Sequence, residues 1–300
     1  MELKEFAEGV LKGVEEKAGG KLKMRLVPRE KNNGIIFTGI TASRPESSNG
    51  TCIYLNGYYE GYCNSRITLA KVTEDVYDKL IGHCNDLDGV DMRVLWDWEA
   101  AKECIHAKLV NREMNRGFLK RVPYRNFLDL AVIYYVTVDG LSEGVNGAFT
   151  VSERNMEVWK KKEDELYRTA VFNMHLHGEP VFESMDEVLR SIMPGFQLPS
   201  PVSTPVEMHV LTNKEKIFGA AEILDSGTLK RVSDELGGDF IVLPSSVHEC
   251  IIIPADETVS YQELADMVTE INVDAVSIEE RLSDHVYLYE RKVGTLRIAA

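Results

Sequence analysis

The chain has 300 residues, of which 44% are apolar and 27% are charged, with a formal net charge of −14 and a pI near 5.1. This length supports a complete hydrophobic core, and at roughly 100–200 residues per domain it predicts one large or two modest domains. The composition is typical of a soluble globular protein. The acidic balance argues against a nucleic-acid partner, because neutralising phosphates requires a basic face.

Several further classes of protein are excluded by what the chain lacks. Residues 1–11 carry Glu2, Glu5 and Glu8 among their apolar residues, a pattern unlike a secretory signal or a transit peptide. No stretch approaches the roughly 18 apolar residues of a membrane span. The five cysteines are an odd number without metal-ligand spacing, and no Walker loop or dinucleotide fingerprint occurs. The sequence therefore predicts a cytoplasmic protein with no metal, no cofactor and no membrane partner.

The first third of the chain shows helical and strand-like spacing of its apolar residues in turn. These patterns predict, in chain order, a helix over 2–18, a hairpin of strands 22–27 and 35–41, a short strand at 52–55 and a helix over 69–84. Gly19 and Gly20 end the first helix, as glycine commonly does. We therefore expect an α+β arrangement from the start of the chain.

The middle of the chain contains the strongest strand pattern. We expect a helix from Trp98 to about Ala107 and an edge strand at 108–110. Residues 127–138 are apolar on both faces, which is typical of a central strand. A long helix over 152–176 follows, because apolar residues continue there at helical spacing.

A proline-rich segment divides the sequence in two. Four prolines lie within twelve residues between Pro194 and Pro205, which predicts a connection over 180–205 between an N-terminal half, 1–179, and a C-terminal half, 206–300. The C-terminal half shows the order β-β-α-β-β-α-β, with its second strand at 219–224. Because strands and helices do not alternate strictly, we predict an α+β fold of mixed sheets with helices packed on them.

The first candidate site lies between two apolar, β-rich runs within Phe240–Pro254. It contains Ser245, Ser246, His248 and Glu249. A hydroxyl, an imidazole and a carboxylate this close together are the groups of a serine hydrolase. No Gly-x-Ser-x-Gly elbow exposes either hydroxyl, however, and Pro-Ser-Ser also makes a good turn at a strand end. Both a structural turn and a catalytic or ligand site stay open.

The second candidate site lies in the segment Glu99–Arg125, which holds 7 basic and 3 acidic residues, and extends into the central strand. Its polar residues are Asn111, Arg112, Asn115, Arg116 and Asp129. They either fix the chain where it enters the central strand or bind a small anion through an arginine and amide donors.

Short motifs spread over the whole chain carry a resemblance to a known family. They are Ile53-Tyr54-Leu55-Asn56, Lys108-Leu109-Val110-Asn111, Val122-Pro123-Tyr124, Leu128–Val132, Leu211-Thr212-Asn213, Gly219-Ala220-Ala221, Leu243–Glu249 and Leu282–Tyr287. With them the chain resembles the family called domain of unknown function 5688 over essentially its full length. The resemblance implies a bacterial protein. It implies no activity and no catalytic residues, because the family has none assigned.

Two classes of function follow from these observations. The first, which we favour, is a non-enzymatic binding or interaction protein with an unknown protein or small-molecule partner, because no residues have the spacing of a known catalytic set. The second is a hydrolase-like enzyme that uses Ser245 or Ser246 with His248 and Glu249. The contacts of the His248 ring distinguish the two.

Overall fold

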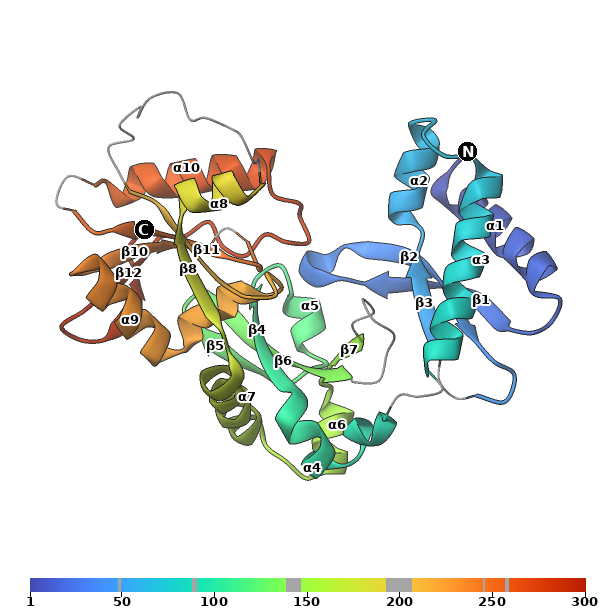
Figure 1. Ribbon diagram of the computed structural model, residues 1–300, viewed down its shortest axis with the longest axis horizontal. Helices are drawn as coiled ribbons and strands as arrows, with labels where there is room; N and C mark the ends of the chain where they lie inside the picture. The colour runs from blue at the N-terminus through green and yellow to red at the C-terminus, as the bar shows by residue number, and fades with distance from the viewer. Residues whose placement is uncertain (48–49, 88–90, 139–146, 193–206, 245, 257–258) are drawn as a thin grey trace. The chain divides into compact units, whose positions relative to one another are not determined.

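The computed structural model describes residues 1–47, 50–87, 91–138, 147–192, 207–244, 246–256 and 259–300 (Figure 1). Its strands form three antiparallel sheets, with helices packed on them, so the predicted α+β class is confirmed, although the sheets are antiparallel rather than mixed. The chain forms two compact units. One is Met1–Met92 with Val138–Gly147, and the other is Arg93–Thr137 with Ala148–Ala300.

The first unit is a three-stranded sheet with helices on one face. Its elements are α1 (Leu3–Ala18), β1 (Lys23–Glu30), β2 (Ile36–Ser43), β3 (Gly50–Tyr54), α2 (Asn56–Cys63) and α3 (Leu69–Asp86), with the short 3-10 turn η1 (Asn32–Gly34) closing the hairpin. The strand order is β1-β2-β3. All the helices and strands predicted for this part of the sequence are present.

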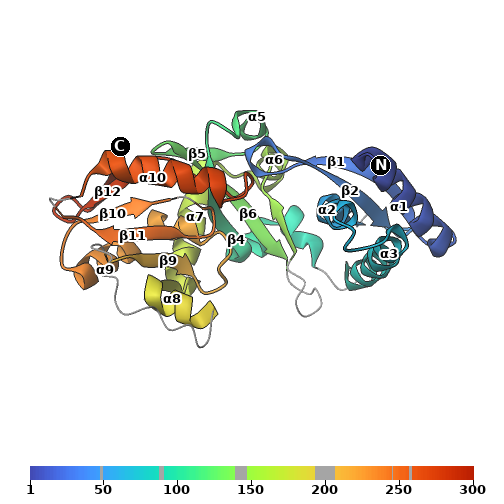
Figure 2. The ribbon, with the colours of Figure 1, turned by 90° about the horizontal axis from the view of Figure 1, so that it is seen from above.

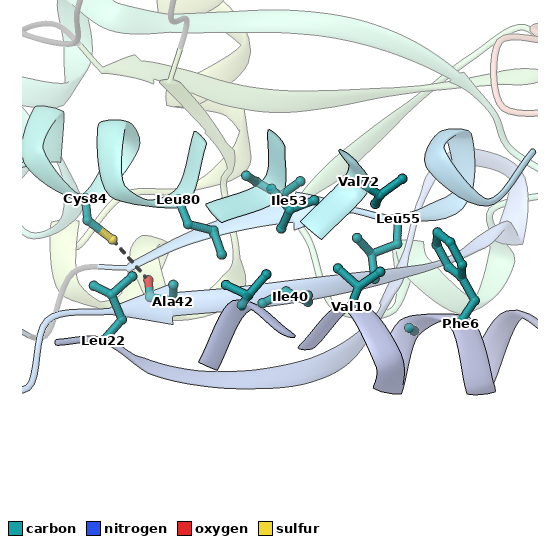
Figure 3. Close-up of a cluster of buried hydrophobic side chains, with 13 residues drawn as sticks. Phe6, Val10, Leu22, Ile40, Ala42, Ile53, Leu55, Val72, Leu80 and Cys84 are labelled. Carbon is teal, nitrogen blue, oxygen red and sulfur yellow. Dashed lines mark hydrogen bonds between the residues drawn. The ribbon is translucent and has the colours of Figure 1, made fainter. Parts of the chain in front are cut away.

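The core of this unit forms between the sheet and the helices α1 and α3 (Figure 3). Phe6 and Val10 on α1 and Leu80 on α3 are fully buried, as is Ile40 on the sheet. Each such side chain contributes about 1.5–3 kcal/mol when removed from water. The buried Cys84 thiol donates to the Ala42 carbonyl at 3.8 Å, which joins α3 to β2.

Two glycines on α1 face α3 at different separations. A Cβ atom added at Gly13 would lie 2.7 Å from Cγ2 of Thr73, whereas one added at Gly9 would lie 3.6 Å from Cδ2 of Leu69. The Thr73 side chain is buried, and its hydroxyl donates to the Leu69 carbonyl at 2.9 Å. The two helices can therefore approach closely at Gly13 because it has no side chain.

The second unit begins with a smaller sheet of four strands. Its elements are η3 (Met92–Leu95), α4 (Trp98–Ala101), η4 (Lys102–Cys104), β4 (Ile105–Asn111), α5 (Arg116–Leu119), β5 (Tyr124–Phe127), β6 (Leu130–Val138), β7 (Gly147–Thr150), α6 (Glu153–Trp159) and α7 (Glu163–His177). β6 pairs with β4, β5 and β7. The central strand predicted at 127–138 is therefore present as β6, whose first five side chains are all buried.

A six-stranded sheet forms the rest of this unit. Its elements are β8 (Pro180–Ser184), α8 (Met185–Ile192), β9 (His209–Asn213), η5 (Gly219–Leu224), α9 (Ser226–Leu236), β10 (Phe240–Leu243), β11 (Cys250–Pro254), α10 (Tyr261–Asp274), β12 (Tyr287–Glu290) and β13 (Thr295–Ile298). The strand order is β13-β12-β10-β11-β9-β8.

Helical segments cover both faces of the six-stranded sheet. On one face, Leu264 and Val268 of α10 pack with Ile241 and Leu243 of β10. On the other, the buried thiol of Cys250 donates to the carbonyl of Ala220 in η5 at 3.9 Å. Figure 2 shows α10 and α9 on opposite sides of these strands.

Two predicted helices are shorter than the sequence pattern indicates. The helical run at 98–107 gives way to strand β4 at Ile105, since Ile105, Ala107 and Leu109 alternate inward. The helix predicted over 152–176 is interrupted at Lys160, whose backbone is left-handed with φ 56°. A second helix, α7, begins after it, where the Glu165 side chain accepts the Lys162 backbone N–H at 3.1 Å.

The predicted strand at 219–224 is a buried 3-10 helix, η5. A Cβ atom at Gly219 would lie 2.2 Å from the Thr212 hydroxyl and 2.6 Å from the His248 carbonyl oxygen. The small residues Gly219, Ala220 and Ala221 therefore let this segment pack tightly against β9. An apolar run of small residues predicts burial here but not the type of element.

The division of the chain falls after Met92, whereas the proline-rich segment predicted a connection at 180–205. Residues 180–184 form β8, which pairs with β9 through partners such as Phe182 and Leu211, and so belong to the six-stranded sheet. Residues 193–206 lie outside the described residues. The strands β8 and β13 were not predicted, because both are short and largely unburied.

The two glycines of α1 provide a matched test of this packing. We predict that Gly9→Ala stabilises the protein by up to about 1 kcal/mol, because alanine favours helix over glycine and fits the space. Gly13→Ala should lose that gain, and Gly13→Val should destabilise by about 1–3 kcal/mol through overpacking against Thr73. Urea unfolding followed by circular dichroism measures both effects. Equal stabilities for the two alanine variants would contradict the close approach at Gly13.

Candidate functional site

The serine and histidine of the first candidate site lie in the connection between β10 and β11. Ser246 is buried, and its hydroxyl oxygen accepts a hydrogen bond from the His248 backbone N–H at 3.0 Å. The backbone N–H of Val247, which lies between these two residues, donates to the Glu280 carbonyl at 2.8 Å. Ser245 lies outside the described residues. The Ser246 hydroxyl therefore closes the turn, as serine side chains often do.

The His248 ring contacts Phe218 and Glu280 rather than a serine. Its Nδ1 atom accepts the backbone N–H of Phe218 at 3.3 Å, so the neutral ring carries its proton on Nε2. Nε2 faces a carboxylate oxygen of Glu280 at 3.7 Å. Among the described residues no serine hydroxyl bonds to this ring. The contact by which a histidine activates a serine nucleophile is thus absent between His248 and Ser246.

The His248 ring instead ends a row of four half-buried rings, which we call the ring row: His106, Tyr135, Phe218 and His248. His106 and Tyr135 stack with centroids 5.1 Å apart, and Phe218 stacks on His248 at 5.7 Å. Tyr135 and Phe218 meet edge to face at 5.4 Å. Four segments distant in sequence therefore supply one continuous aromatic surface.

A lysine spans the middle of the ring row. The ammonium group of Lys108 lies 4.2 Å from the centroid of Phe218 and 5.7 Å from that of Tyr135. Burial raises the pKa of Tyr135 to about 12, with a smaller contribution from the negative charge of Glu215. Burial also lowers the pKa of His106. At neutral pH the row thus presents a protonated tyrosine, a largely neutral His106 and one fixed positive charge.

The backbone of Phe218 adopts a left-handed conformation, with φ 55°. This region is unfavourable for a bulky residue and costs of order 1 kcal/mol. Here it is stabilised by the hydrogen bond to His248 and by three aromatic or cationic contacts. The chain therefore places this ring between Tyr135 and His248 against its local preference.

Of the ring row, only His248 was a candidate from sequence. A signal for two further members exists in the strand patterns. His106 and Lys108 alternate with the buried residues of β4, and Tyr135 is the direct cross-strand partner of His106. Residues opposite each other in an antiparallel pair share a face. Phe218 had no such signal, since it precedes a segment predicted as a strand.

The second candidate site is a junction between the two sheets of the second unit. The Asp129 carboxylate accepts the hydroxyl of Ser283 at 2.7 Å and that of Tyr287 at 2.5 Å. Asn111 donates through Nδ2 to the Leu282 carbonyl at 2.9 Å. Burial, followed by the charge of Asp129, raises the pKa of Tyr287, so its hydroxyl keeps its proton and remains a donor. We call this set of contacts the Asp129 junction.

The remaining polar residues near the junction are also engaged. The buried Asn115 donates through Nδ2 to the Asn111 carbonyl at 2.8 Å. Arg116 is exposed and forms an ion pair with Glu113 at 2.6 Å, and Arg112 is half-buried in the turn after β4. The amide groups thus bind backbone carbonyls of the chain itself, which is the arrangement of a structural set.

A buried carboxyl group that was not a sequence candidate lies in η5. Glu222 is only 4% exposed, and among the described residues its Oε2 atom has no hydrogen-bond partner. Burial, followed by repulsion from Asp225, raises its pKa from 4.5 to about 7. The acid stands within the apolar sequence Gly-Ala-Ala-Glu-Ile-Leu, and that context is the signal that could have identified it.

The fold and these contacts define an α+β protein built on antiparallel sheets. No group of three acidic, histidine or cysteine side chains in the described ranges is arranged to hold a metal ion, and none of the helices there has the length and apolar composition that crossing a bilayer requires. The chain belongs to DUF5688, a family of unknown function, whose model matches residues 3–291. No curated protein and no solved structure matches this chain.

We predict that the Asp129 junction is a major source of stability in the second unit. Asp129→Ala should lower the free energy of unfolding by about 2–4 kcal/mol, because it removes the charged acceptor that the buried Ser283 and Tyr287 hydroxyls share. Tyr287→Phe should cost about 1–2 kcal/mol alone and almost nothing in the Asp129→Ala background. A double-mutant cycle by urea unfolding measures this coupling. Additive effects would show that the contact is not stabilising.

Glu222 should make the stability depend on pH. Its pKa is higher in the folded state, about 7, than in the unfolded chain. Between pH 4.5 and 7 the unfolded chain loses this proton first, so rising pH favours unfolding. The loss should reach about 3 kcal/mol above pH 7. Glu222→Gln should therefore be more stable than wild type at pH 8 and similar to it at pH 4.5. A difference that does not change with pH, measured by urea unfolding, would contradict the raised pKa.

Proposed function

We propose that this chain is a non-enzymatic, cytoplasmic binding protein whose partner contacts the ring row. The observation that carries the proposal is that His106, Tyr135, Phe218 and His248 form one aromatic surface that is half-buried rather than enclosed in a core. Half-exposed aromatic groups dominate the energetics of binding surfaces, because they bury large areas at a small cost in conformational entropy.

The chemistry of the ring row favours a partner with a flat or apolar group beside an anionic one. The rings offer planar faces and apolar edges for packing. Lys108 supplies the positive charge next to them. A small aromatic acid, or a protein segment that carries an aromatic residue next to a carboxylate, combines both features.

The hydrolase alternative receives less support from the same residues. The Ser246 hydroxyl bonds to backbone, and the His248 Nδ1 atom bonds to the Phe218 N–H. A catalytic pair needs the hydroxyl and the imidazole within hydrogen-bond reach of each other. The binding hypothesis needs neither group to be free.

The test is a thermal-shift screen of small acids, nucleotides, aromatic carboxylates and metal ions. A panel member that occupies the ring row at about 100 times its Kd should add about 2.7 kcal/mol of stability to the wild type. That corresponds to a rise in Tm of roughly 5–10 °C. The shift should be lost in His248→Ala and Lys108→Met, because both remove part of the surface.

His177→Ala is the matched control, since His177 is exposed at the end of α7, outside the ring row. It should keep the full shift. Equal shifts in the wild type and His248→Ala would place the site elsewhere, and no shift with any panel member would count against the ring row. Ester hydrolysis that disappears in Ser246→Ala would support the hydrolase instead.

A further inference from the structure

The sheet of the first unit has a second face, opposite its core. The strand register places cross-strand partners on the same side, and the core face carries Ile40, Ala42 and Ile53 (Figure 3). The opposite face, which we call the open face, consists of Lys23, Arg25, Val27 and Arg29 on β1, Phe37, Gly39, Thr41 and Ser43 on β2, and Gly50, Cys52 and Tyr54 on β3.

The charges of the open face all have one sign. Lys23, Arg25 and Arg29 are exposed on it, and Lys31 reaches over its end from the hairpin turn. Glu30 is the one acid in the three strands. It pairs with Ile36, and both residues alternate with open-face residues along their strands, so Glu30 lies on the core side of the sheet. Within the described residues, neither Arg25 nor Arg29 forms an ion pair. Their charges are thus available to an anionic partner.

Two aromatic rings lie among these charges. Phe37 and Tyr54 meet edge to face, with centroids 5.7 Å apart. Tyr54 lies across Gly39, where a Cβ atom would come 3.3 Å from the ring and 2.6 Å from the Cys52 sulfur. The glycine therefore allows the ring to lie low over the sheet. The Lys31 ammonium lies 3.7 Å from the Tyr54 centroid.

We propose that the open face binds single-stranded nucleic acid. Such binding combines cations that neutralise the phosphates with aromatic rings on which unpaired bases stack. Arg25 and Arg29 stand about 13 Å apart along β1, so they can contact separate phosphates while the rings lie at the end near Arg29. A base stacked on Tyr54 takes the place of Lys31, whose ammonium moves to the adjacent phosphate.

The two aromatic rings of the face favour a single strand over a duplex. In a duplex the bases are already stacked on each other, so their faces cannot reach Phe37 or Tyr54. The net charge of −14 gave the expectation of no nucleic-acid partner. Binding, however, depends on the charge of the contacting face, and every charged side chain on the strands of the open face is positive.

The test uses the full chain and fluorescence anisotropy with labelled oligothymidylate and oligouridylate of about fifteen nucleotides. We expect saturable binding whose affinity falls with salt, with a slope of about −2 to −3 on logarithmic axes for three or four neutralised phosphates. Arg25→Glu combined with Arg29→Glu should weaken binding about tenfold or more and reduce the slope. Tyr54→Leu should weaken binding by about fivefold or more through lost stacking, with its slope unchanged.

The matched control is Lys4→Glu combined with Lys12→Glu, which makes the same charge change at exposed positions of α1. It should leave the affinity close to wild type. Circular dichroism is used to check that each variant is folded. The proposal is overturned if neither oligonucleotide binds, or if the α1 variant weakens binding as much as the β1 variant. Binding of heparin or duplex DNA as tight as that of the single strand, with no effect of Tyr54→Leu, would also overturn it.

Discussion

The carboxylate of Asp129 is the contact on which the arrangement of the second unit depends. It lies just before β6 of the smaller sheet and accepts hydrogen bonds from Tyr287 on β12 of the larger sheet and from Ser283 in the segment that leads into β12. The two donors come from positions 154 and 158 residues away in sequence. A charged acceptor with two hydroxyl donors is among the stronger polar contacts in a protein interior. It fixes how the two sheets meet.

The effect of this contact extends to His248 through the backbone. The N–H of Ser283 donates to the Pro244 carbonyl, and the N–H of Val247 donates to the Glu280 carbonyl. The segment around Glu280 and Ser283, which Asp129 binds, therefore fixes the position of the β10–β11 turn. His248 follows directly and reaches Phe218. The two candidate sites seen in the sequence are thus parts of one structure, in which the first is positioned by the second.

The sequence predicted individual helices and strands better than the contacts between them. Helices α1, α3, α9 and α10 and the central strand β6 have strong periodic patterns, and all are present. The 3-10 helix η5 could not be foreseen, because its form depends on the close approach of Gly219 to β9 and to the His248 carbonyl. Local pattern carries no information about such distant contacts. The same limit applies to the ring row, whose four members come from four separate segments, and to the division after Met92, which is a property of packing.

The most direct test of this account is native-state hydrogen exchange in Asp129→Asn, compared with the wild type. An asparagine keeps the size of the side chain but loses one acceptor and the charge. We predict faster exchange of the Val247, Ser283 and Phe218 amides, each of which depends on the segment that Asp129 fixes. The amides of β2 in the first unit should exchange at their wild-type rates. Unchanged exchange at Val247 and Phe218 would contradict the claim that Asp129 positions the turn and the ring row.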